Sequence, residues 1–159
     1  MSTQWKGKAI REENLGIHVE KQLATLADGN IFATYGRVLI TCLWGESITA
    51  GDGGATTLYL QEETNSVALC AATTITGDVT GTLYVMTGDF AVILNGTGNT
   101  PVIGAVGSLS AFQRNSFIVG MAAAADAIQQ VQTGDDTTGV IKWHAYYIPL
   151  EEGAYMAAS

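Results

Sequence analysis

Short runs of β-branched and aromatic residues, separated by glycine-rich turns, constrain the fold of this chain more than any other feature. From residue 31 onward, strand-like runs recur about every 8–12 residues, a spacing typical of sandwiches and barrels. Turn-forming residues separate the runs, as in "GDGG" at 51–54 and "GDDTTG" at 134–139. We therefore predict an all-β fold, an antiparallel β-sandwich or jelly-roll-like barrel with an extended N-terminal arm.

The segment "RVLITCLWG" at 37–45 is predicted to be a strand that is covered on both faces, because apolar residues fall on both sides of the alternation. One face should carry Val38, Ile40, Cys42 and Trp44, and the other Leu39, Thr41 and Leu43. The run "SVALCAATTI" at 66–75 is predicted to be a further strand. Cys42 and Cys70 are expected to be buried free thiols, since disulfides are disfavoured in a reducing compartment.

The segment "GVIKWHAYYIPLEEGA" at 139–154 is predicted to contain the closing strand. Its core side should carry Ile141, Trp143, Ala145 and Tyr147. The opposite side carries Lys142, His144 and Tyr146, which we predict to form a subunit interface. Pairing should end at Pro149, which has no N–H to donate, and Leu150 should then pack inward.

A chain of 159 residues is expected to form one domain. We predict an N-terminal arm at 1–16, a single β domain at 17–154 and a short C-terminal tail at 155–159. The stretch "NLGIHVEKQLATLADGN" at 14–30 fits both a helical and a strand pattern, and the sequence leaves the two open.

Charge is sparse and unevenly distributed. Charged residues make up 14% of the chain and the net charge is −8, which argues against nucleic-acid binding. Residues 1–21 hold four of the seven basic residues, so only the arm leans basic. No apolar run reaches the roughly 18 residues of a membrane-spanning helix, and no signal-peptide pattern opens the sequence. We expect a protein made in the cytoplasm that binds neither membrane nor nucleic acid.

Residues that could carry chemistry are few and scattered. The two histidines, His18 and His144, lie 126 positions apart, and neither sits in a metal-ligand motif. The pairs Glu62-Glu63, Asp135-Asp136 and Glu151-Glu152 are interpreted as solvated charges, since neighbouring residues on a strand point to opposite faces. The "GDGG" loop is interpreted as a surface turn. We therefore predict no catalytic residues, no metal, no cofactor and no enzymatic activity.

The order of the motifs resembles a group of small tailed-bacteriophage virion proteins. The resemblance lies in "IFATYGRVLI", in "LC" before "GTLY", and in the ending "G-x-x-KW-x-x-x-Y-x-PL-(D/E)-(D/E)-GA", which matches residues 139–154. It covers about residues 22–154, with a gap through the loops at 95–125. The last motif is the most specific of the three.

This resemblance implies a capsid decoration, or cement, protein. Such proteins are β-sandwich or jelly-roll modules, often homotrimers, that sit on the outside of the virion head over junctions between copies of the major capsid protein. The expected partners are therefore the major capsid protein and the chain itself. The arm is our preferred contact with the capsid or a neighbour, through Trp5, Lys6, Lys8, Ile10 and Arg11.

Two alternatives from other classes stay open. A carbohydrate-binding sandwich of a phage tail or adhesin would need an exposed aromatic platform, formed by Tyr59, Tyr84 or Tyr146. A small barrel enzyme of the cupin type would need clustered histidines and a carboxylate at metal spacing, which two distant histidines disfavour.

Overall fold

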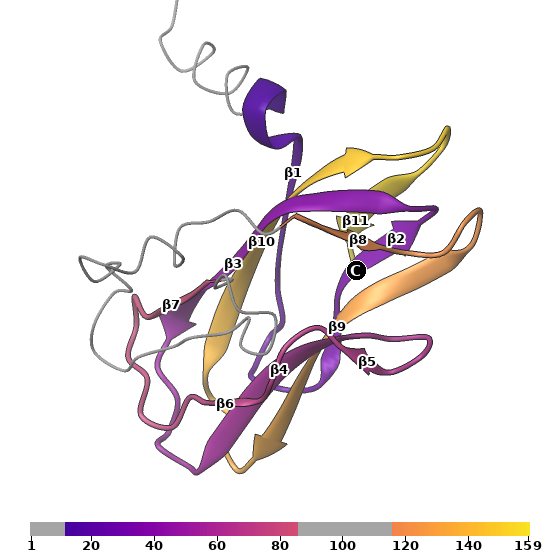
Figure 1. Cartoon of the computed structure of the whole chain (residues 1–159). Helices are drawn as coiled ribbons and strands as arrows, with labels where there is room; N and C mark the ends of the chain where they lie inside the picture. The colour runs from indigo at the N-terminus through magenta and orange to yellow at the C-terminus, as the bar shows by residue number, and fades with distance from the viewer. Residues whose placement is uncertain (1–11, 86–115) are drawn as a thin grey trace, which may run out of the picture.

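The computed structural model describes residues 12–85 and 116–159, which form an antiparallel β-sandwich (Figure 1). In these two segments the chain makes eleven strands and one helical turn at 12–15. The strands are β1 (Ile17–Gln22), β2 (Gly29–Tyr35), β3 (Val38–Thr49), β4 (Thr56–Glu62), β5 (Val67–Ala68), β6 (Thr73–Thr74), β7 (Leu83–Val85), β8 (Phe117–Val119), β9 (Ala125–Gly134), β10 (Val140–Pro149) and β11 (Tyr155–Ala158). The predicted all-β fold is confirmed.

The strands lie in two sheets, and β1 to β4 alternate between them. Sheet 1 has the order β1-β10-β3-β7, and β8 also pairs with β3. Sheet 2 has the order β11-β2-β9-β4-β5, and β6 also pairs with β4. Within the described ranges the two sheets stay separate, so the fold is a sandwich rather than a closed barrel. The apolar core is buried between their facing sides.

Strand β10 lies inside sheet 1, between β1 and β3, and it follows the predicted alternation. The residues buried on its core side are Ile141, Trp143, Ala145 and Tyr147. Trp143 is fully buried, and its indole N–H donates to the side-chain oxygen of Gln130 on β9 at 2.8 Å. Gln130 in turn donates to the carbonyl of Ala27 at 2.9 Å. These two bonds give the buried side chains of Trp143 and Gln130 their hydrogen-bond partners, and the first of them links the two sheets.

A β-bulge makes the predicted face assignment of β3 wrong in its second half. Tyr147 pairs with Ile40 and Tyr146 pairs with Cys42, so Thr41 is an extra residue on β3. Ile40 and Thr41 are both buried as a result. Beyond this point the alternation is inverted, and Cys42 and Trp44 leave the core side.

The end of β10 and the C-terminus differ from expectation in two ways. The pairing of β10 does end at Pro149, but Leu150 is 47% exposed and does not pack inward. Its N–H donates to the carbonyl of Arg37 instead. Residues 155–158, expected to be a tail, form strand β11, which pairs with β2 and buries Met156.

Strand pairing also shows how two further segments fold, one left open by the sequence and one predicted to be a strand. Residues 17–22 form a strand because they pair with β10 along their whole length. The expected strand at 66–75 forms only two short pieces, β5 and β6, which pair end to end along β4. Neither cysteine forms a disulfide, as predicted; Cys70 is buried as expected, whereas Cys42 is only half-buried. In the described part of the chain, no helix is long and apolar enough to cross a membrane.

Candidate functional site

The outer face of sheet 1 brings the two histidines of the chain together. In the β1–β10 pairing, His18 lies opposite Tyr146 and Glu20 lies opposite His144. In the β10–β3 pairing, His144 lies opposite Trp44. Because directly paired residues point to the same side of a sheet, these side chains share the face turned away from the core. We call His18, Glu20, Trp44, Lys142, His144 and Tyr146 the outer-face cluster.

Four polar side chains of the cluster are linked to one another. His18 Nε2 lies 3.2 Å from His144 Nδ1, and the planes of the two rings differ by 8°. The same Nδ1 atom lies 3.5 Å from Glu20 Oε2. The other carboxylate oxygen, Oε1, accepts from Lys142 Nζ at 2.9 Å. Three possible metal ligands, His18, Glu20 and His144, therefore lie close together, and the ammonium group of Lys142 lies beside them.

Aromatic rings hold both imidazoles in place. His144 stacks on the indole of Trp44 with centroids 4.1 Å apart, and His18 stacks on Tyr146 with centroids 4.6 Å apart. The side chain of His144 is only 12% exposed. Desolvation lowers the pKa of His144, although the nearby Glu20 carboxylate opposes this. The hydrogen bond from Lys142 lowers the pKa of Glu20. Both shifts favour a neutral imidazole beside an ionised carboxylate.

The predicted interface residues Lys142, His144 and Tyr146 do lie together on this face. Sequence reasoning missed His18, Glu20 and Trp44, which come from β1 and β3. The available signal was that His18 and Glu20 occupy alternate positions of one run, but nothing local indicated that this run pairs with β10. The predicted arm contacts Trp5, Lys6, Lys8, Ile10 and Arg11 lie outside the described residues.

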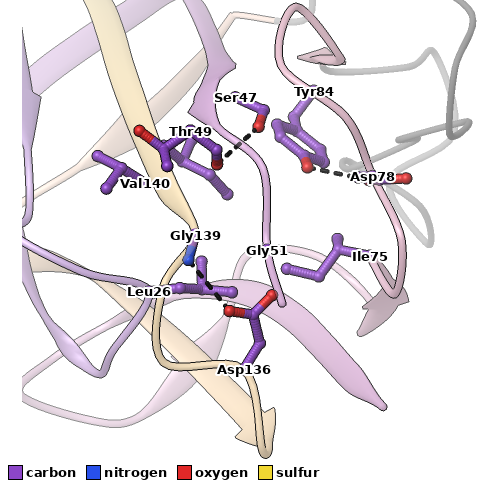
Figure 2. A pocket seen from close by; sticks show the side chains of 11 residues that line it. Leu26, Ser47, Thr49, Gly51, Ile75, Asp78, Tyr84, Asp136, Gly139 and Val140 are labelled. Atoms are coloured by element: carbon purple, nitrogen blue, oxygen red, sulfur yellow. Dashed lines mark hydrogen bonds between the residues drawn. The ribbon is translucent and has the colours of Figure 1, made fainter. Parts of the chain in front are cut away.

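A second polar site surrounds a small pocket between the turn at 134–139 and the loop at 51–54 (Figure 2). The pocket has room for about one water molecule, so it excludes a substrate of ordinary size. Asp136 was interpreted as a solvated charge, but it is buried. Its Oδ1 accepts from the N–H groups of Thr138 and Gly139 at 2.9 and 3.0 Å. The carboxylate is thus part of the fold.

The "GDGG" loop is built around this same carboxylate. A Cβ on Gly51 would lie 1.6 Å from Asp136 Oδ2, so only glycine fits there. The N–H of Gly54 donates to Asp52 Oδ1 within the loop. Burial raises the pKa of Asp136, but the backbone N–H donors of Gly139, Thr138 and Asp52 outweigh it and lower the pKa overall. The site therefore stabilises a turn and shows no phosphate-binding geometry.

Across the pocket, the hydroxyl of Tyr84 donates to Asp78 Oδ2 at 2.9 Å (Figure 2). Both side chains are buried, and desolvation raises the pKa of each. Tyr84 therefore cannot belong to an exposed aromatic platform. Tyr59 is half-buried and packs against the core, and Tyr146 is half-buried beside the ring of His18.

Comparison with protein families, curated proteins and solved structures finds no match to this chain.

Proposed function

We propose that this protein is a structural component of a tailed-phage virion, a cement protein that binds the outside of the head and bridges major capsid proteins. The observation that carries the proposal is the ending "GVIKWHAYYIPLEEGA", which matches the most specific motif of the resembling virion proteins. The same motif implies assembly as a homotrimer on the capsid exterior, after synthesis in the host cytoplasm.

The structure gives four residues of that motif a structural role: Gly139, Trp143, Tyr147 and Glu151. Trp143 and Tyr147 fill the core, and Gly139 donates its N–H to Asp136. Glu151 accepts from the backbone N–H groups of Arg37 and Ala123, which fixes the turn after Pro149. These four residues of the motif therefore contribute to the sandwich fold of this chain. This supports the resemblance at the level of the fold.

The exposed apolar side chains support a protein that acts by binding other proteins. Eight large apolar side chains of the described residues are 40–60% exposed, and two of them, Tyr35 and Tyr155, have ring centroids 6.0 Å apart. Contiguous exposed apolar surface is typical of interaction sites, and the Tyr35–Tyr155 pair offers such surface. A trimer would present each contact three times, so individually weak contacts add through effective concentration. Binding only the mature shell would then stabilise that shell by mass action.

The proposal is tested with capsids of the phage that encodes this chain. Purified protein is mixed with expanded capsids and with precursor shells, and each mixture is pelleted. We expect a trimer by light scattering, and co-pelleting with expanded capsids alone. The variant Trp5→Ala/Arg11→Ala should remain trimeric but pellet more weakly, because its arm contacts are lost. A monomer that stays in the supernatant with both particles would contradict the proposal, as would specific glycan binding without capsid binding.

A further inference from the structure

We propose that His18, Glu20 and His144 form a binding site for a divalent transition-metal ion of the zinc class on the outer face of sheet 1. This inference does not depend on the proposed role in the virion. It rests on three donor atoms that lie within 4.8 Å of one another and come from two adjacent strands.

The donor set selects the class of metal. Two imidazole nitrogens and one carboxylate oxygen are ligands that Zn²⁺, Ni²⁺ and Cu²⁺ accept. Ca²⁺ and Mg²⁺ prefer sites made of six or so oxygen atoms, which this face does not supply. Three protein ligands also match the open type of zinc site, in which a fourth position is left for water or an incoming group.

The distances fit a metal ion placed between the donors. With metal–nitrogen bonds of about 2.05 Å, the two nitrogens 3.2 Å apart subtend an angle of about 103° at the metal. With a metal–oxygen bond of about 2.1 Å, the 3.5 Å separation of His144 Nδ1 and Glu20 Oε2 gives about 115°. Both angles are close to the tetrahedral value of about 109°. The third pair, His18 and Glu20, lies within 4.8 Å, so the exposed Glu20 side chain must rotate towards His18 for all three donors to reach one ion.

Neighbouring groups hold the donors in position, which is what the surroundings of a metal site must do. Trp44 supports the ring of His144, and Tyr146 supports that of His18. Lys142 binds Glu20 Oε1 and leaves Oε2 turned towards His144. Glu20 can therefore bind a metal through one oxygen while its other oxygen keeps the lysine, which also offsets part of the carboxylate charge.

The protons of the two rings must be rearranged when a metal binds. At 3.2 Å one ring donates N–H to the other, so one of the facing nitrogens carries a proton. A metal needs both nitrogens unprotonated, and the donor ring therefore moves its proton to its other nitrogen. For two neutral rings this is a change of tautomer with no net release of protons.

The test is a titration of the full-length protein with Zn²⁺ by calorimetry, together with Co²⁺ as a spectroscopic probe. We expect one Zn²⁺ per chain, the visible absorption of four-coordinate Co²⁺, and no binding of Ca²⁺. In protein with ¹⁵N-labelled histidine, only two rings contribute signals, and both should shift on addition of Zn²⁺. Absence of stoichiometric Zn²⁺ binding, or a shift confined to one ring, would overturn the site.

Matched variants separate this site from other ligands on the same surface. His18→Gln, Glu20→Gln and His144→Gln should each weaken Zn²⁺ binding by at least about tenfold. Cys42→Ser and Glu46→Gln alter other groups of β3 and should change it by less than about twofold. His18 and Glu20 are exposed, so their variants test the site even if His144→Gln disturbs the stack on Trp44. Loss of binding in Cys42→Ser, or its retention in both His18→Gln and Glu20→Gln, would refute the assignment.

Discussion

Removal of the Asp136 carboxylate should destabilise the protein far more than removal of its neighbour Asp135. Asp136 is 2% exposed, whereas Asp135 is exposed. In Asp136→Ala, the N–H groups of Thr138 and Gly139 lose their acceptor, and hydrogen bonds to a charged group contribute about 1.5–3 kcal/mol each. We expect the free energy of unfolding to fall by about 3–5 kcal/mol, a large part of the 5–15 kcal/mol typical of a domain.

Asp136→Asn separates the contribution of charge from that of shape. The amide keeps an oxygen for the two N–H donors, but those bonds become neutral, at about 0.5–1.5 kcal/mol each. The NH₂ group must also take the place of Oδ2 beside Gly51, where there is no spare room. The loss should therefore be intermediate, about 2 kcal/mol. Asp135→Ala is the matched control and should stay within about 0.5 kcal/mol of wild type.

The measurement is urea unfolding followed by tryptophan fluorescence, at neutral pH and at acidic pH. The pKa of Asp136 is lowered from 3.8 in the folded protein, so its charge contributes stability fully above the unfolded pKa. That contribution is lost as the pH falls through the folded pKa. The difference between wild type and Asp136→Asn should accordingly shrink below pH 3.8 or so. Equal stability of Asp136→Ala and Asp135→Ala at pH 7 would refute the reasoning.

Three further substitutions probe the core and the pocket. Gln130→Met leaves the buried Trp143 N–H without an acceptor and should cost about 2–3 kcal/mol in urea unfolding; a loss below about 1 kcal/mol would contradict this. Gly45→Ala places a Cβ 2.8 Å from the ring of Trp143, and this overpacking should cost about 1–3 kcal/mol, seen as a lower Tm. Tyr84→Phe removes the donor to Asp78, so the already raised pKa of that carboxyl should rise further. The variant should then be destabilised most at neutral pH and least when acid protonates Asp78; a loss that does not depend on pH would contradict this.

The alternation of apolar and polar residues correctly predicted those features that depend on one strand alone. The alternation of Trp143 and Tyr147 with Lys142 and His144 is confirmed because the two-residue period of a strand decides which side chains face the core. The faces of β3 could not be predicted in the same way. The inserted Thr41 becomes visible only when β3 is set against β10, since a bulge is a mismatch between two strands.

Long-range pairing explains the other misses. The sequence predicts a surface charge at Asp136 because it does not show that the glycine loop at 51–54 packs over this carboxylate. His18 and His144 were treated as unrelated because 126 positions separate them, and their contact depends on the register of β1 with β10. A metal site formed by these two histidines could therefore not be predicted without knowledge of how β1 pairs with β10.

Residues on the outer face of sheet 1 can be substituted to test for binding without loss of the fold. Burial of Trp143, Ala145 and Tyr147 against the core obliges Lys142 and His144 to face outward, where their substitution removes no core packing. Lys142→Met should therefore leave stability almost unchanged, because an exposed ion pair such as Lys142–Glu20 contributes about 0–1 kcal/mol. If this face is a subunit interface of the proposed trimer, the variant should be more monomeric than wild type in light scattering. If the face serves only to bind a metal, the variant should remain a trimer while its affinity for Zn²⁺ changes.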